Sequence, residues 1–189
     1  MRIALLLSLI CGCLALAPEG VTISLALNRE TLMAGNFWQL WTGHLVHFSA
    51  EHAVLDVVTL FLVTVIAERE MGRLKTGVAL LIGAPLISIG MLLMAPNLMV
   101  YKGSSALAAL IGFAVGSLIW RRNPHLRTAL GCLGLVAITK TILDATGWSP
   151  GFTSLPTGVQ VAWQAHVIAC AIGAVYVAAL TLTIDSRMK

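Results

Sequence analysis

The sequence is poor in charged and aromatic residues. Only 11% of its 189 residues are Asp, Glu, Lys or Arg and 6% are aromatic, whereas roughly a quarter of the residues in a soluble protein are charged. Its apolar content is 58% and its mean hydropathy is +0.91. This composition excludes an ordinary soluble domain and is typical of an integral membrane protein that contacts the lipid bilayer.

The four cysteines show neither the spacing of a disulfide framework nor that of a metal site. They all lie within apolar segments, at Cys11, Cys13, Cys132 and Cys170, so we interpret them as small packing residues. The 12 Lys and Arg residues form short clusters without interleaved aromatic residues, which is not the pattern of a nucleic-acid-binding surface. The sequence therefore predicts no metal, no cofactor and no nucleic-acid partner.

Charge clusters and Pro/Gly breaks divide the chain into six apolar segments, each of which we expect to be a helix: 3–17, 52–67, 76–94, 104–120, 128–143 and 161–184. A helix needs about 20 residues to cross a bilayer, so this length accommodates six crossings and no separate soluble domain. We predict an all-α membrane protein, a single bundle of six transmembrane helices over residues 1–189. Residues 18–51 form the long connection, where Trp38 and Trp41 indicate short helices at the membrane interface.

The positive residues predict the orientation of the bundle, because Lys and Arg in short loops are retained in the cytoplasm. They collect at alternate ends of successive segments, at Arg2, Arg69, Arg73, Lys75, Arg121, Arg122, Arg127, Arg187 and Lys189. Both termini are therefore expected in the cytoplasm and residues 18–51 on the outer side. Lys140 lies in the fifth segment, close enough to its outer end to snorkel. Residues 1–17 also fit a cleavable signal peptide, which would leave the other five helices oriented in the same way.

Polar and ionisable side chains at membrane depth are costly and are candidates for function. Here they lie toward the outer side, at His44, His47, Glu51, His52, Asp56, Ser104, Ser105 and His166. Ser105 and His166 each head a stripe of small residues at helical spacing, with Ala108 or Ala109, Gly112 and Gly116 after the serine and Ala169 and Gly173 after the histidine. Such stripes let two membrane helices approach closely.

These stripes predict that the Ser105 hydroxyl meets the His166 imidazole, the pairing in which a neutral base activates a serine nucleophile. Gly103, Ser104 and Ser105 begin a helix, so their backbone N–H groups are suited to stabilising an oxyanion. The alternative is ordinary helix packing, with Ser105 a hydrogen-bonded helix serine.

Three motifs in this order resemble those of the rhomboid intramembrane serine proteases, and within them the short rhombosortase branch. The family shows His-x4-His-x3-Asn, Gly-x-Ser-Gly and Ala-His-x2-Gly-x3-Gly. The matching stretches here are His47-x4-His52-x3-Asp56, Gly103-Ser104-Ser105-Ala106 and Ala165-His166-x2-Ala169-x3-Gly173. Residues 36–47 also resemble the rhombosortase stretch before the second helix.

The resemblance implies that Ser105 is the nucleophile and His166 the general base of a dyad. It implies that His52 and the Ser105 N–H donate to the oxyanion. Asp56 stands where the family has Asn, and Ala106 and Ala169 replace glycines. For Asp56 we expect a neutral carboxyl that donates a hydrogen bond. The alternatives are a carboxylate that accepts a hydrogen bond from His52 or His166, and a structural substitution that lowers activity.

The outer histidines have two interpretations. His44, His47 and Glu51 at i, i+3 and i+7 would share one helical face and suit zinc. We favour the other interpretation, in which His47 anchors a loop and His44, His47, Glu51 and Ser104 line the wet rim of the active-site pocket. His125 is expected to be solvated in a cytoplasmic loop.

By this resemblance the protein is a multi-pass protease of the cell inner membrane, with its active site facing the periplasm. Its expected substrates are single-pass membrane proteins that carry a C-terminal Gly-rich sorting tail and a transmembrane helix. Two alternatives stay open: a non-catalytic rhomboid-like protein that binds or escorts transmembrane helices, and an unrelated transporter or metal-binding protein. The lack of a convincing internal repeat argues against a transporter.

Overall fold

A computed structural model describes residues 1–148 and 161–185 of the chain. The six predicted helices all form: α1 (Arg2–Ala15), α5 (Ala50–Glu70), α6 (Arg73–Met94), α7 (Ser105–Arg122), α8 (Arg127–Ala145) and α9 (Trp163–Asp185). The connection between α1 and α5, called the outer connection below, holds α2 (Glu19–Leu25), α3 (Arg29–Met33) and α4 (Gln39–Thr42). A 3-10 turn, η1 (Pro124–Leu126), precedes α8. The prediction of short helices in this connection is therefore confirmed.

Five helical stretches are long and apolar enough to cross a bilayer: α5, α6, α7, residues Pro124–Ala145 with α8, and α9. The sixth predicted crossing is α1, which has 14 residues. At 1.5 Å per residue it is about 21 Å long, shorter than the roughly 30 Å hydrocarbon core. The described residues therefore form a helical membrane protein with five helices long and apolar enough to span a bilayer and a shorter apolar helix packed beside them.

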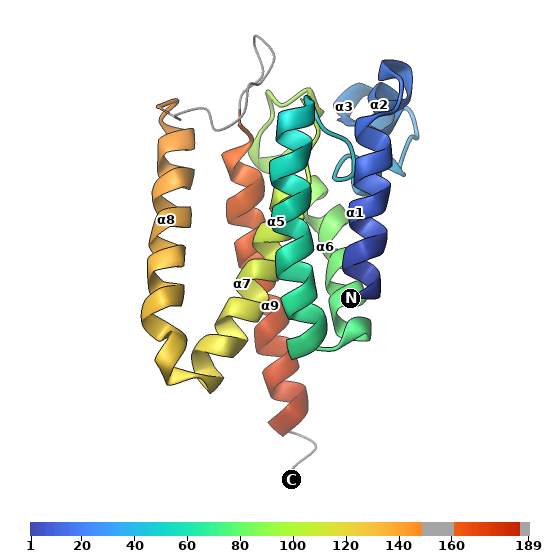
Figure 1. Cartoon of the computed structure of the whole chain (residues 1–189). Helices are drawn as coiled ribbons and strands as arrows, with labels where there is room; N and C mark the ends of the chain where they lie inside the picture. The colour runs from blue at the N-terminus through green and yellow to red at the C-terminus, as the bar shows by residue number, and fades with distance from the viewer. Residues whose placement is uncertain (149–160, 186–189) are drawn as a thin grey trace.

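The helices stand side by side with the outer connection at one end of the bundle (Figure 1). The start of α1, the end of α9 and the turns after α5 and α7 lie at the opposite end. Among the described residues, the positive clusters fall in the turns after α5 and α7 and at the start of α1. They therefore share one end of the bundle, as the predicted alternation requires.

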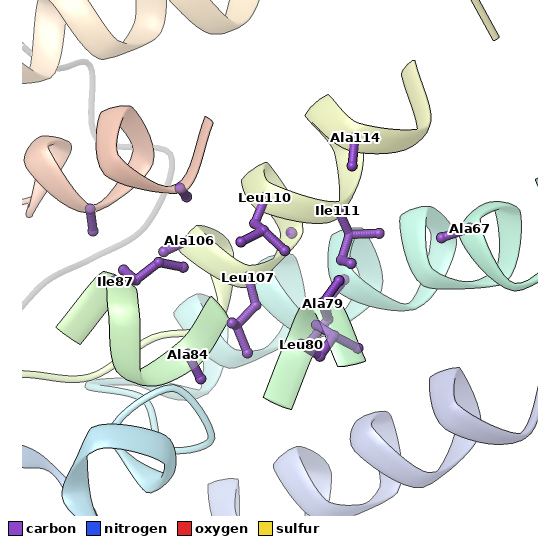
Figure 2. Packing of buried hydrophobic residues seen from close by; sticks show 14 of the residues in the cluster. Ala67, Ala79, Leu80, Ala84, Ile87, Ala106, Leu107, Leu110, Ile111 and Ala114 are labelled. Carbon is purple, nitrogen blue, oxygen red and sulfur yellow. The ribbon is translucent and has the colours of Figure 1, made fainter. Parts of the chain in front are cut away.

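Helix α7 is the centre of the bundle and makes its most extensive contacts with α9 and α5. Its buried residues include Leu107, Leu110 and Ile111, which extend toward the helix that carries Ala84 and Ile87 (Figure 2). Gly83 of α6 lets Leu110 come close, since a Cβ there would lie 2.7 Å from Leu110 Cδ1. The core thus depends on small residues of α6 that accept larger side chains of α7.

The small residues of α9 allow it to pack closely against α7, as predicted. Ala165, Ala169 and Gly173 are buried on one face, and a Cβ at Gly173 would lie 2.9 Å from the carbonyl oxygen of Leu110. The two glycines of the predicted stripe on α7 do not face α9. A Cβ at Gly112 would meet Val63 of α5, and one at Gly116 would meet nothing within 4 Å. On α7, a Cβ at Gly173 would meet the carbonyl oxygen of Leu110 and the side chain of Phe113.

A proline in α6 provides the attachment point for the outer connection. Pro85 has no N–H to donate to the carbonyl of Leu81, four residues earlier. The indole N–H of Trp41 donates to that carbonyl at 2.9 Å. One turn further on, Ser88 Oγ donates to Leu40 O at 2.8 Å. The segment before α5 is therefore fixed to the middle of α6.

Two further contacts close the outer end. Strands β1 (Leu27–Asn28) and β2 (Val100–Tyr101) pair antiparallel, with Leu27 opposite Tyr101. The Arg29 guanidinium donates to Leu92 O at 2.8 Å and to Ala95 O at 3.2 Å, which satisfies carbonyls at the C-terminus of α6. Together they hold the residues just before α7 against the outer connection.

At the other end, a buried carboxylate of α5 caps α1. Glu68 accepts hydrogen bonds from Arg2 N at 3.0 Å and Ala4 N at 2.9 Å, and it also contacts the amine of Met1. A carboxylate at a helix N-terminus satisfies orphan N–H groups and stabilises the helix dipole. Glu68 therefore ties α1 to the bundle.

The interpretation of all four cysteines as buried packing residues is only partly right. Cys11 is buried and Cys170 is half-buried, but Cys13 and Cys132 are exposed. These two lie on α1 and α8, where the described helices leave them uncovered.

Candidate active site

A cavity of about 630 Å³ lies between α5, α7, α8 and α9. Its lining includes Ser105 from α7, His166 from α9, and His52 and Asp56 from α5. Four predicted site residues, from three separate stretches of sequence, therefore share one cavity. The lining includes residues at the starts of α5 and α7, and these helix starts lie at the end of the bundle that holds α2 and α3 (Figure 1).

The two adjacent serines have different surroundings. Ser105 is the first residue of α7, is half-buried and lines the cavity. Ser104 is fully buried, and its Oγ is hydrogen-bonded to His47 Nε2 at 3.2 Å. Of these two serines, Ser105 therefore lines the cavity and Ser104 does not. No hydrogen bond joins Ser105 to His166 among the described residues, so their direct contact stays a prediction.

Asp56 lies at the start of α7 and binds its backbone. The carboxylate oxygen Oδ2 accepts hydrogen bonds from Ser104 N at 2.8 Å and Ser105 N at 2.9 Å. The same oxygen lies 3.3 Å from His52 Nε2 and 3.6 Å from His47 Nε2. Four nitrogen atoms therefore surround one buried oxygen.

Gly103 makes this arrangement possible. Its φ of +144° is in a region that L side chains rarely adopt, and a Cβ there would lie 3.2 Å from both Asp56 Oδ2 and His52 Cε1. Its N–H donates to Gly43 O at 3.1 Å. A side chain at this position would separate Asp56 from the start of α7.

The geometry differs from the expected free oxyanion donor. The Ser105 N–H was predicted to be available for a substrate oxyanion, but it donates to Asp56. Asp56 was predicted to be a neutral donor, but its Oδ2 accepts two N–H bonds. This placement fits the alternative in which Asp56 is an acceptor beside His52. The physical reason is the short side chain of Asp56, which reaches the orphan N–H groups at the start of α7.

The outer histidines are buried rather than placed on a wet rim. His44 is fully buried, with its Nε2 3.0 Å from Ser88 Oγ and 3.1 Å from Ala84 O. His47 is 8% exposed. Neither histidine lines the cavity, and nor does Ser104. The predicted rim of His44, His47 and Ser104 is therefore wrong, because these polar groups bond to one another and to α6.

The zinc interpretation required His44, His47 and Glu51 to share a helical face. The helix α5 begins only at Ala50, where Ser49 Oγ accepts the N–H of His52 at 3.2 Å. His44 and His47 precede the helix, and His44 points to Ser88 of α6. Residues 1–148 and 161–185 contain no group of three or more His, Cys, Asp or Glu side chains arranged to hold a metal ion.

Burial lowers the pKa of His44 from 6.5 to about 4. It also lowers the pKa of His47 to about 4, although the nearby Asp56 charge opposes the shift. Both imidazoles are therefore neutral at pH 7. A neutral ring can act as donor and acceptor at once, which suits the loop-anchoring role expected for His47.

We expect stability to fall on acidification because of His44. Its pKa is about 6.5 unfolded and about 4 folded, so the unfolded chain binds more protons between these values. Stability is therefore fully present above pH 6.5 and is lost as the pH falls toward 4. This one histidine should cost about 2 kcal/mol between pH 7 and pH 5. Thermal unfolding at both pH values measures it.

The matched comparison is His44→Gln, which keeps a side-chain donor but does not titrate. The loss of stability between pH 7 and pH 5 should be smaller in this variant than in the parent chain. An equal loss in both proteins would contradict the assignment of this pH dependence to His44.

Several cavity residues were not found from the sequence. Phe48 stacks on His52 with ring centroids 6.2 Å apart, and Lys102 Nζ lies 5.5 Å from the centroid of Phe48. Burial lowers the pKa of Lys102. On α8, Lys140 binds Asp144 Oδ2 at 2.6 Å and both line the cavity. Lys140 therefore pairs with Asp144 across one helical turn, and the i, i+4 spacing of the two residues was the signal for this pair.

The Tyr101 hydroxyl supports the backbone at Gly103, just before α7. It donates to Gly103 O at 2.7 Å, and burial raises its pKa. This contact fixes the backbone directly before the two serines.

Fold and site together define a multi-pass helical membrane protein with a serine and a histidine on one cavity between its helices. The family model for the Rhomboid domain matches residues 34–183, which is most of the chain. The chain therefore belongs to the rhomboid family, whose members are intramembrane serine proteases. No curated protein matches the sequence.

Proposed function

We propose that this protein is an intramembrane serine endopeptidase that uses Ser105 as nucleophile and His166 as general base. The observation that carries the proposal is the shared cavity, which Ser105 and His166 both line although 61 residues separate them in the chain. Membership of the rhomboid family supports it. A cavity between helices also gives water a place to reach a peptide bond at membrane depth.

The reaction begins when His166 takes the hydroxyl proton of Ser105. The serine Oγ then attacks the carbonyl carbon of the scissile bond, and the carbonyl oxygen becomes an oxyanion. His166 passes the proton to the leaving amine, the C–N bond breaks and an acyl-enzyme remains. Water attacks that ester with His166 again as base, which releases the acid product and restores Ser105.

The nitrogen atoms beside Ser105 are suited to the oxyanion. His52 Nε2 and the N–H groups of Ser104 and Ser105 surround a single point at the start of α7. Donors preorganised around a developing charge supply a large part of the rate enhancement in acyl transfer. In the structure Asp56 Oδ2 occupies that point.

For the substrate we propose secreted proteins with a C-terminal Gly-rich tail followed by one transmembrane helix. The rhombosortase-like motifs support this substrate class. The physical argument is that a helical carbonyl is already hydrogen-bonded, so the helix must open locally before Ser105 reaches it. Glycine lowers the cost of this opening because it destabilises helices.

We place the protein in the inner membrane with both termini in the cytoplasm and the cavity facing the periplasm. The positive clusters support this orientation, because they fall at the end of the bundle opposite the outer connection (Figure 1). The substrate would then be cut near the outer leaflet.

A reporter tests the substrate class. The full chain is co-expressed with a secreted protein that ends in a Gly-rich segment, a transmembrane helix and a basic end. A matched reporter has the glycines replaced by leucines. We expect release of the Gly-rich reporter at least about tenfold faster, because each helical glycine costs about 1 kcal/mol relative to a good helix former. Equal release of both reporters would reject the Gly-rich preference.

The alternative is a non-catalytic rhomboid-like protein that binds or escorts transmembrane helices. The observation that favours it is the engagement of the Ser105 N–H by Asp56. A fluorophosphonate probe distinguishes the two, because it reacts with an activated serine. Labelling at Ser105 supports the protease, and an inert Ser105 supports the binding protein.

A further inference from the structure

We propose that the Asp56 carboxylate is a built-in inhibitor that occupies the oxyanion site of the resting protein. This inference rests on the proposed function, because it requires Ser105 to be the nucleophile. It goes further by naming the occupant of the site and the event that must precede the reaction: displacement of Asp56 Oδ2 from the start of α7.

The first argument is the position of Asp56. An oxyanion formed by attack of Ser105 Oγ lies next to the backbone N–H of the same residue, as in serine hydrolases that use the nucleophile's own N–H. That N–H donates to Asp56 Oδ2 at 2.9 Å, and the neighbouring N–H of Ser104 does so at 2.8 Å. The carboxylate therefore takes both backbone donors of the proposed oxyanion site.

The second argument is charge. Hydrogen bonds from N–H groups to an ionised acceptor are roughly twice as strong as those to a neutral acceptor. The histidines His52 and His47 approach the same oxygen at 3.3 Å and 3.6 Å. The two N–H bonds from Ser104 and Ser105 hold an ionised Asp56 in place, and it would repel a second anion at the same point.

The third argument is that the surroundings fix Asp56 in this place. Its side chain is 10% exposed. Gly103 leaves room for the carboxylate, since a Cβ at this position would lie 3.2 Å from Asp56 Oδ2. The resting arrangement is therefore a packed part of the structure, and substrate must compete with it.

Glu68 provides a matched control on the same helix. It also accepts two backbone N–H bonds at a helix N-terminus, from Arg2 and Ala4 of α1, but it does not line the cavity. The variants Asp56→Asn and Glu68→Gln each replace a helix-capping carboxylate by a neutral amide. Only the first changes the charge at the proposed oxyanion site.

The experiment measures the rate at which a fluorophosphonate labels Ser105 in the purified full chain, together with thermal unfolding. We expect Asp56→Asn to label roughly tenfold faster than the parent, because a neutral amide holds the two N–H groups less strongly than a carboxylate. It should also unfold at a lower temperature. Glu68→Gln should lose stability but label at the parent rate. An Asp56→Asn variant that labels no faster than the parent would overturn the inference.

A second variant covers the case in which Asp56→Asn does not fold. In Asp56→Ala the carboxylate is absent, and formate is a small anion able to replace it. Formate at millimolar concentration should slow labelling of Asp56→Ala several-fold and leave the parent rate unchanged. Absence of any formate effect in a reactive Asp56→Ala protein would contradict the occupied site.

The outcomes separate this inference from the proposed function. Labelling of Ser105 in the parent at a rate that Asp56→Asn does not exceed leaves the protease assignment intact and removes the inhibitor role. Absence of Ser105 labelling in the parent, Asp56→Asn and Asp56→Ala removes both.

Discussion

Replacement of Ser105 by alanine is expected to reduce peptide-bond cleavage by about 10⁴-fold or more, as removal of the nucleophile does in other serine hydrolases. The hydroxyl is the atom that attacks, and no other serine lines the cavity among the described residues. Reporter processing by parent and variant measures the loss, and fluorophosphonate labelling should disappear with it.

The adjacent serine is the matched control. Ser104→Ala removes a hydroxyl one residue away, but this hydroxyl is fully buried and bonded to His47 Nε2 at 3.2 Å. We expect Ser104→Ala to keep cleavage within about tenfold of the parent, because it removes one supporting hydrogen bond worth about 1 kcal/mol. Cleavage that persists in Ser105→Ala and disappears in Ser104→Ala would reassign the nucleophile to Ser104.

The sequence predicted the helices well because membrane helices are defined by composition alone. Long apolar stretches between positive clusters allow few other structures in lipid. The predicted crossing by α1 is not shown, because a helix of 14 residues is shorter than the length needed to span a bilayer. Pro85 was visible in the sequence, but its role in receiving Trp41 depended on tertiary contacts.

The shared cavity was predictable because Ser105 and His166 were both expected near the starts of helices that enter from the same side of the bundle. The contacts around it were not. Periodicity places Gly112 on the same stripe as Ser105, but it does not say which neighbour the stripe faces, and Gly112 faces α5. The start of α5 at Ala50, set by the Ser49 cap, removed His44 and His47 from the predicted helix face.

Asp56 shows most clearly where sequence reasoning stops. The residue was recognised as a departure from the rhomboid motif and was predicted to be a neutral donor, with an acceptor and a structural substitution as the alternatives. The deciding fact is that its Oδ2 reaches the N–H groups of Ser104 and Ser105, 48 and 49 residues further along the chain. Only the packing of α5 against α7 supplies that contact.

Replacement of His166 by alanine is expected to reduce cleavage by about 10³- to 10⁴-fold, the usual contribution of a general base in a serine hydrolase. The physical reason is that a serine hydroxyl stays protonated at neutral pH without an adjacent acceptor. Reporter processing measures the loss. The double variant Ser105→Ala/His166→Ala should be no less active than Ser105→Ala alone, since residues that act as one unit do not contribute additively.

The control and the contradicting result both come from other histidines of the chain. His125 is exposed in the turn between α7 and α8, as predicted, so His125→Ala should process the reporter at the parent rate. If His166→Ala stays within about tenfold of the parent, the base is another residue. His52 is then the next to test, because it is the other imidazole on the cavity among the described residues. In that case His52→Ala should lose at least about 10³-fold, and the task of holding the oxyanion would pass to the N–H groups that Asp56 now occupies.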